Sequence, residues 1–516
     1  MGIHQTGLAK AALAAILLAG CSAEPGLPLP AGGGGLLIRD VRVVDGSGAP
    51  GFSGDVRIAA GDIVEVGDLE TRDGEQVFEG EGLVLAPGFI DTHSHADGDI
   101  FAQPAALPAV SQGITTVVVG QDGGSPFPLA EFFARLEERP AAVNVATYVG
   151  HNTLRAEVLG GDYRRAATEA EVEEMARLLR RELGSGALGL STGLEYDPGI
   201  YSQRSEVLAL ARVAAASGGR YISHLRSEDR WLEDALEEII FIGRDTGMPV
   251  QVSHLKLAMK RLWGEAPRII AMLDAARAEG VQISADIYPY EYWQSNMMVL
   301  LPERDAGDRT AVATALEEIA PPDGLWFTGF APQSDYVGKT LTEIAALRGV
   351  DPVTAFMQLA EEAGAMEAET GESADSIIGT SMTADDIRQL LLWEGTNVCT
   401  DGGFDDLHPR ARGAFPRILG RYVRQENLLR LEEAVHRMTG LAAEHMNFTD
   451  RGLIRPGARA DLVLFDPDAV IDRATPQNPE LLSAGITAVW VAGEQVYARG
   501  RATGARPGAV IRRSLR

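Results

Sequence analysis

The stretch Pro87-Gly88-Phe89-Ile90-Asp91-Thr92-His93-Ser94-His95 decides how the rest of the chain is interpreted. It runs from an apolar segment into two histidines at alternate positions. Residues i and i+2 of a strand point the same way, so both imidazoles can reach one ion. The stretch therefore predicts a buried strand that ends in metal ligands.

Apolar segments of this kind recur along the chain. Near-continuous apolar runs are typical of strands that are buried on both faces. Charge-rich helical segments separate most of them: Glu169–Leu183, Trp231–Arg244, Ala266–Ala278 and Ala384–Leu392. Eight such units predict an α/β fold, a TIM-like (β/α)8 barrel over residues 87–450. The expected strands are Gly88–His95, Thr115–Gly120, Asn144–Gly150, Ala187–Ser191, Arg220–Leu225, Val250–His254, Val281–Asp286 and Asn397–Asp401.

Two other regions flank or interrupt this barrel. Residues 36–86 and 451–516 contain short alternating strands, which predict a small β-sandwich built from both ends of the chain. About 110 residues separate the last two barrel strands, too many for a loop, so we expect an inserted subdomain at about 291–375. Four of its apolar side chains either line a pocket or form its own core, namely Tyr292, Trp293, Met297 and Met298.

The N-terminus reads as an export signal. Residues 11–19 form an apolar run that is too short to span a bilayer but suits a signal peptide over residues 1–20. The following Leu18-Ala19-Gly20-Cys21 resembles the lipobox of bacterial lipoproteins, which implies that Cys21 is lipidated. Residues 21–35 suit a flexible tether. We expect an exported lipoprotein facing the periplasm, on the outer membrane in a Gram-negative source, or the cell surface. A plain secretory signal is the alternative.

Composition excludes other classes of function. The 46 Lys and Arg residues against 73 Asp and Glu residues give a net charge of −27, which repels phosphate backbones and excludes a nucleic-acid partner. The same charge disfavours docking on anionic lipid, so membrane contact is expected only through the anchor. Two cysteines exclude a disulfide framework.

Metal-competent side chains stand at the ends of four expected strands. His93 and His95 follow the first, His224 ends the fifth, His254 the sixth, and Asp401 the eighth. Reactive side chains of a (β/α)8 barrel lie at the carboxyl ends of its strands. A single histidine there is more often structural, but the joint pattern predicts a site for two metal ions.

With these residues in view, the chain resembles the amidohydrolase superfamily and, within it, the N-acyl-D-amino-acid deacylase (D-aminoacylase) family. The resemblance implies His93 and His95 as ligands of one zinc ion, His224 and His254 as ligands of the other, and Asp401 as the catalytic carboxylate. It is carried by PGFIDTHSH at 87–95, GITTVVVG at 113–120, GHNTLR at 150–155, GALGLSTGLEYDPGIYS at 186–202, SHLRSE at 223–228, QVSHLK at 251–256, DIYPY at 286–290, HPRARGAFPRILGRYVR at 408–424 and ADLVLFDP at 460–467.

One block departs from the family. Such deacylases carry a zinc-binding cysteine after the second strand, in a GNCG context, whereas this chain reads Gly120-Gln121-Asp122-Gly123-Gly124. Glu195 is the favoured replacement because its longer side chain can span two ions. Asp122, which occupies the place of the cysteine, is the second candidate, and a centre with one zinc ion is the third.

The expected reaction is hydrolysis of the amide bond of an N-acyl-D-amino acid by zinc-activated water, with Asp401 as general base and acid. Lys256, Tyr288 and Arg410 are candidates to bind the α-carboxylate, as the matching positions do in the family. His151 either orients the substrate or is a hydrogen-bonded loop histidine. No further arginine stands out, which favours neutral or apolar side chains.

Three alternatives remain at this stage. A metal-dependent dipeptidase that releases a C-terminal D-residue and a cyclic amide or lactone hydrolase keep the fold and the metal. The third is a non-catalytic binding lipoprotein. The sequence does not predict an oligomeric state.

Overall fold

The computed structural model describes residues 35–371, 373–380 and 382–513. The predicted signal peptide, Cys21 and nearly all of the predicted tether lie outside the described residues.

Eight parallel strand positions follow one another in chain order. Two sheets, β6-β7-β8 and β9-β10-β11-β12-β13-β17, meet where β8 runs on into β9. The first and last strands are joined beyond their ends, where the Asp401 N–H donates to the His93 carbonyl and the His95 N–H to the Gly402 carbonyl. This is the strand order expected of a (β/α)8 barrel. The strands are β6 (Phe89–Asp91), β7 (Ile114–Val119), β8 (Asn144–Thr147), β9 (Val149–Gly150), β10 (Gly189–Gly193), β11 (Arg220–His224), β12 (Val250–Val252), β13 (Ile283–Ile287) and β17 (Thr396–Val398).

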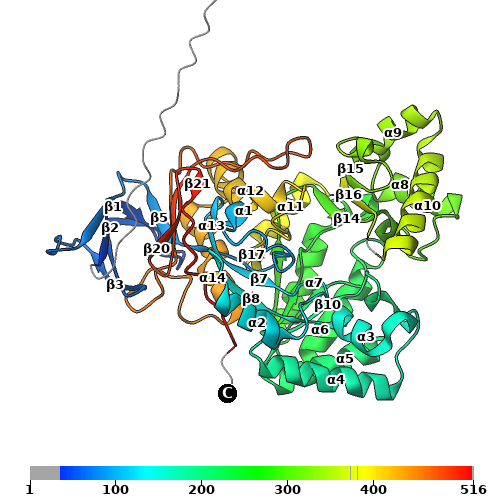
Figure 1. The fold of residues 1–516 in the computed structure, drawn as a ribbon, viewed down its shortest axis with the longest axis horizontal. Coiled ribbons are helices and arrows are strands. Elements are labelled where there is room, and N and C mark those ends of the chain that lie inside the picture. Colours follow the sequence, from blue (N-terminus) through cyan, green and yellow to red (C-terminus); the bar gives the residue numbers. More distant parts are fainter. Residues whose placement is uncertain (1–34, 372, 381, 514–516) are drawn as a thin grey trace, which may run out of the picture.

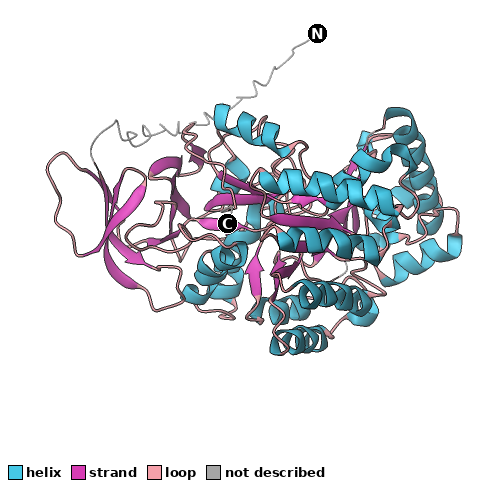
Figure 2. Cartoon of the chain, turned by 90° about the horizontal axis from the view of Figure 1, so that it is seen from below, coloured by secondary structure: helices cyan, strands magenta, loops and turns pink. Residues whose placement is uncertain are grey.

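Helices pack outside these strands (Figure 2). The second longest of the described helices, α4, begins with a capping box between Thr168 and Glu171 and buries its apolar side. No helix among the described residues is long and apolar enough to cross a bilayer. The helices are α1 (Leu107–Val110), α2 (Leu129–Glu138), α3 (His151–Leu159), α4 (Glu169–Gly184), α5 (Arg204–Ala216), α6 (Leu232–Thr246), α7 (Ala266–Ala278), α11 (Ala384–Leu392), α12 (Arg410–Arg417), α13 (Leu431–Met438) and α14 (Gly440–Met446).

Both ends of the described chain build one nine-stranded sheet at one end of the molecule (Figure 1). The two parts join where β5 pairs antiparallel with β18. A separate apolar cluster, which includes Ile38 and Trp490, packs on this sheet. Its strands are β1 (Leu36–Val43), β2 (Phe52–Ala59), β3 (Asp62–Gly67), β4 (Gln76–Glu79), β5 (Val84–Pro87), β18 (Leu462–Phe465), β19 (Ile486–Val491), β20 (Glu494–Ala498) and β21 (Arg501–Ala502).

The insertion between β13 and β17 lies at the opposite end of the molecule (Figure 1). It is a three-stranded antiparallel sheet, in the order β14-β16-β15, with three helices. The sheet runs past residue 375 because β16 pairs with β14 as far as Thr380. Its elements are β14 (Tyr292–Ser295), α8 (Arg309–Glu318), β15 (Leu325–Phe330), α9 (Leu341–Arg348), α10 (Pro352–Thr370) and β16 (Asp375–Thr380).

Candidate active site

The carboxyl ends of five of the parallel strands, β6, β7, β11, β12 and β17, carry the metal-competent residues of the site. Three of its residues, Asp122, His254 and Asp401, have positive φ angles of 51°, 32° and 51°. Side chains other than glycine rarely adopt this conformation, and it persists only where the surrounding structure fixes it. Such positions cluster at functional sites, which agrees with the role expected for these three residues.

The first cluster is formed by His93, His95, Asp122 and Asp401. The His93 and His95 Nε2 atoms each lie 3.4 Å from an Asp122 carboxylate oxygen. They lie 3.5 Å and 3.2 Å from Asp401 Oδ1. Two ligands that each bind a tetrahedral zinc ion at about 2.1 Å stand about 3.4 Å apart, so these spacings fit zinc.

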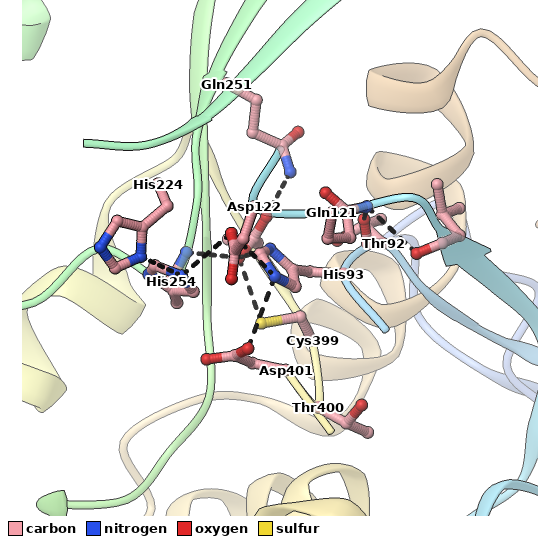
Figure 3. Close-up of polar contacts among 12 residues, drawn as sticks. Thr92, His93, Gln121, Asp122, His224, Gln251, His254, Cys399, Thr400 and Asp401 are labelled. Atoms are coloured by element: carbon pink, nitrogen blue, oxygen red, sulfur yellow. Dashed lines mark hydrogen bonds and ion pairs between the residues drawn. The ribbon is translucent and has the colours of Figure 1, made fainter. Parts of the chain in front are cut away.

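The second cluster is formed by Asp122, His224 and His254. His254 Nε2 lies 3.4 Å from Asp122 Oδ1 and 3.1 Å from His224 Nδ1. Figure 3 shows the Asp122 carboxylate between the rings of His93 and His254. The two clusters therefore share Asp122, and both consist only of imidazole and carboxylate ligands.

An orphaned polar group supports the presence of a cation. The His93 side chain is wholly buried, and neither ring nitrogen has a hydrogen-bond partner within the described chain. Buried polar atoms are otherwise nearly always hydrogen-bonded. A metal ion at the first cluster would satisfy Nε2, so the residues fit zinc.

Three further carboxylates stand behind the histidines. Glu228 Oε1 lies 2.9 Å from His254 Nδ1, and Glu195 Oε2 lies 3.2 Å from His224 Nε2. Asp286 Oδ1 lies 3.7 Å from His93 Nδ1. Metal-binding histidines usually direct their second nitrogen at such a group, which fixes the ring orientation. Sequence reasoning missed Glu228 and Asp286, although both lie in the quoted blocks SHLRSE and DIYPY.

Glu195 does not occupy the place that the sequence favoured for it. Its carboxylate faces the His224 nitrogen opposite the one that faces His254. It is absent from both clusters that contain Asp122 and groups instead with His224 and Glu228. The geometry favours Asp122 over Glu195 as the shared carboxylate.

Asp401 is held in its ionised form. Burial alone would raise the pKa of this carboxyl, but the Arg410 guanidinium, His254 and His93 lower it below its ordinary value. Arg410 Nη1 lies only 2.5 Å from Asp401 Oδ2. An ionised carboxylate beside a metal cluster can accept a proton.

The three candidates for carboxylate binding lie together on the cavity wall. Arg410 and Lys256 stand 4.7 Å and 5.7 Å from the centre of the Tyr288 ring. The Tyr288 hydroxyl is buried without a hydrogen-bond partner in the described residues. Burial raises the pKa of Tyr288, so its O–H remains a donor. Lys256 is already paired with Glu228 at 2.7 Å.

A cavity of about 900 Å³ opens over the two clusters. The insertion supplies one wall with Trp293, Val299, Leu300 and Phe330. Of the four insertion side chains weighed from the sequence, only Trp293 lines this cavity. Met297 and Met298 line an adjoining one, and Tyr292 packs against His408.

His151 is not brought to the site, and its predicted role in orienting substrate is not supported. Its wholly buried ring lies 2.8 Å from Glu206 Oε1, and Arg155 binds the same carboxylate. It does not line the cavity. The physical reason is that His151 is the first residue of helix α3, where its ring contacts the buried pair of Arg155 and Glu206.

We expect zinc binding to depend on the cluster histidines. Elemental analysis of purified full-length protein should give up to two zinc ions per chain. His93→Ala and His224→Ala should each lower the content by at least one ion, because each removes a ligand of one cluster. As a control, His436→Ala should keep it, since the His436 ring lies outside the clusters and, within the described residues, hydrogen-bonds to the Gly46 carbonyl. Unchanged zinc in both cluster variants would contradict the assignment.

The chain matches a model of the Amidohydrolase family over residues 76–319 and 336–497. It is 38% identical over 502 residues to an N-acyl-D-glutamate deacylase of Alcaligenes xylosoxydans xylosoxydans, covering 93% of this chain and 96% of the relative. It is 34% identical over 504 residues to a D-aminoacylase of the same organism, covering 93% and 98%.

A solved structure supports the same relationship. The crystal structure of an N-acyl-D-glutamate deacylase from Bordetella bronchiseptica, complexed with zinc and a phosphonate inhibitor, superposes with a TM-score of 0.82 at 37% identity. It covers 92% of this chain and 99% of that one. This chain therefore belongs to the amidohydrolase family and has N-acyl-D-amino-acid deacylases among its homologues.

Proposed function

We propose that this protein is a zinc-dependent N-acyl-D-amino-acid deacylase, which hydrolyses the amide bond and releases a D-amino acid and a carboxylate. The observation that carries the proposal is the shared position of Asp122 between two histidine pairs, next to the ionised Asp401. The named activities of the homologues agree with it.

The chain's own residues supply most of the mechanism. When bound, zinc polarises a carbonyl and lowers the pKa of a water molecule that it binds. Asp401 accepts the proton of the attacking water and passes it to the leaving nitrogen. Arg410 keeps Asp401 ionised at the start of the reaction. Glu228 and Glu195 orient the histidines from behind.

The substrate carboxylate is held by Tyr288, with Lys256 and Arg410 beside it. The Tyr288 hydroxyl is the unpaired donor, and both cations lie near its ring. The substrate carboxylate is then held at Tyr288 and its amide carbonyl at the metal clusters. With these two groups fixed, only one enantiomer of the amino acid directs its side chain toward the insertion. Three fixed points of this kind discriminate D- from L-amino acids.

The cavity favours substrates with neutral side chains. Lys256 and Arg410 are the only lysine and arginine side chains of the described residues that line it, and both already pair with carboxylates. Arg304, in the adjoining cavity, donates to the main-chain carbonyls of Met298, Leu301 and Glu195. Among the described residues, the first cavity therefore offers no unpaired lysine or arginine to an acidic side chain.

A dipeptidase that releases a C-terminal D-residue is the second candidate. The observation that favours it is an adjoining cavity of about 1530 Å³, which shares Tyr196, Ser295 and Asn296 with the first. An acyl group longer than acetyl, such as an aminoacyl group, can extend in that direction.

We also infer the finer fold and location expected from the sequence. The strand order and its closure at Asp401 and His93 support a TIM-type barrel, and the shared sheet supports the sandwich of both chain ends. The lipobox-like Cys21 supports an exported, lipid-anchored protein whose only membrane contact is the anchor.

The substrate class is tested with a panel of N-acetyl amino acids and dipeptides, with zinc-loaded protein. We expect turnover of D- but not L-substrates, and faster hydrolysis of N-acetyl-D-glutamine than of the isosteric N-acetyl-D-glutamate. Turnover confined to dipeptides would favour the second candidate. Hydrolysis of L-substrates alone, or of nothing in the panel, would contradict the proposal.

The role of Asp401 is tested by Asp401→Asn. Because general acid–base catalysis contributes about 10²–10⁴-fold, kcat should fall by about that factor with little change in KM. Asp197→Asn is the matched control, since this partly exposed aspartate lies outside both clusters. A kcat within a factor of a few of the parent in Asp401→Asn would rule out this role.

The anchor is tested by metabolic labelling with a radioactive fatty acid in a bacterial host. The parent should incorporate label and sediment with membranes, whereas Cys21→Ser should not incorporate it, because the acceptor thiol is gone. Equal labelling of both proteins would contradict lipidation at Cys21, and membrane-free secretion of the parent would favour a plain signal peptide.

A further inference from the structure

We propose that the Asp122 carboxylate is a ligand shared by both zinc ions and replaces the cysteine thiolate that related deacylases carry at this place. The centre is then bridged through oxygen and contains no sulfur ligand. This inference rests on the proposed function, because it assumes that the two clusters hold zinc.

The first step is the position of the carboxylate. Asp122 Oδ2 is 3.4 Å from His95 Nε2, while Oδ1 is 3.4 Å from both His93 Nε2 and His254 Nε2. The carboxylate thus meets both histidines of the first zinc site and one of the second. Of the ligand groups found in the described residues, the first and second clusters have only Asp122 in common.

The second step excludes the other candidate bridge. His224 directs Nδ1 at His254 and Nε2 at Glu195, so Glu195 lies on the far side of this ring. A carboxylate in that position orients a ligand from behind and does not bridge the ions. Arg304 further fixes the Glu195 backbone by donating to its carbonyl oxygen.

The third step is the rigidity of the loop that carries Asp122. Gln121 Nε2 donates to the carbonyls of Thr92 and Val118, at 3.0 Å and 3.1 Å. A Cβ atom on Gly193 would stand 2.0 Å from the Asp122 carbonyl oxygen, so strand β10 packs directly on the loop. The left-handed backbone of Asp122 is therefore held from two sides.

The fourth step concerns sulfur. Cys399 is the only cysteine among the described residues, and its Sγ lies 3.1 Å from Asp286 Oδ1, outside both clusters. Imidazole and carboxylate are thus the only ligands that the clusters offer. A carboxylate has two oxygens and is a harder ligand than a thiolate, so it can bridge two ions without sulfur.

A gain of signal tests contact between residue 122 and the metal. Full-length protein is loaded with Co²⁺ in place of zinc and its near-ultraviolet absorption is recorded. The parent should show no thiolate-to-cobalt charge-transfer band, whereas Asp122→Cys should show one. Cys399→Ser is the control and should leave the spectrum of the parent unchanged. Absence of the band from Co²⁺-loaded Asp122→Cys would overturn the proposal.

Bridging itself is tested with Mn²⁺, whose paramagnetic resonance spectrum distinguishes a coupled pair from isolated ions. Two Mn²⁺ ions in the parent should be coupled, and Glu195→Gln should keep the coupling. Asp122→Asn should lose it. The affinity of Asp122→Asn for the second ion should also fall. The loss should exceed the roughly 10–100-fold that is typical when a residue that only orients a metal ligand is replaced. Coupling that persists in Asp122→Asn and disappears in Glu195→Gln would make Glu195 the bridge.

Failure of this inference and failure of the proposed function give different results. Two bound ions and turnover of N-acetyl-D-amino acids, combined with an unchanged spectrum in Asp122→Asn, would overturn only the bridge. A parent protein that binds no Co²⁺ or Mn²⁺ and hydrolyses nothing in the panel would overturn both.

Discussion

The closure of the strand ring is the constraint on which the site depends. The hydrogen bonds that join the first and last strands come from the site itself, through Asp401 to His93 and His95 to Gly402. Beneath them Asp91 accepts from the Thr400 N–H at 2.8 Å and from its hydroxyl at 2.5 Å. The fold cannot close without bringing the first histidine pair and the proposed general base together.

The balance of charge among the side chains at the carboxyl ends of the strands then determines which ion the site can bind. Burial acts against ionisation of Asp122, but the neighbouring His93 and His254 lower the pKa of its carboxyl well below the ordinary value. Burial also acts against charged His254, yet Glu228, Asp401 and Asp122 raise its pKa to about 10. The ionised carboxylates therefore stabilise protonated imidazoles, and the protonated imidazoles stabilise the ionised carboxylates. A divalent cation can supply that charge in place of protons, which explains why so many ionisable groups are tolerated here.

How much of this was predictable from sequence differs between parts of the site. The histidines were predictable because strand period and strand order fix where His93, His224 and His254 must point. The bridging carboxylate was not, because its choice depends on the loop conformation after β7 and not on side-chain length. Glu195 has the longer reach, but the chain after β10 places it behind His224. The sequence left the role of His151 open for a similar reason, since pairing with Glu206 is a tertiary contact that no local pattern reveals.

The insertion and the reacting groups are mechanically linked through one neutral histidine. Burial, followed by the charge of Arg410, lowers the pKa of His408 well below its ordinary value. Its Nδ1 accepts from the Arg410 N–H at 3.0 Å, so its Nε2 carries the hydrogen that it donates to the Tyr292 carbonyl, also at 3.0 Å. Tyr292 begins β14, the first strand of the insertion. The insertion, which lines the cavity, and the arginine that lowers the pKa of Asp401 thus contact the same histidine. Because His408 contacts both segments, displacing β14 would also displace Arg410, the partner of Asp401.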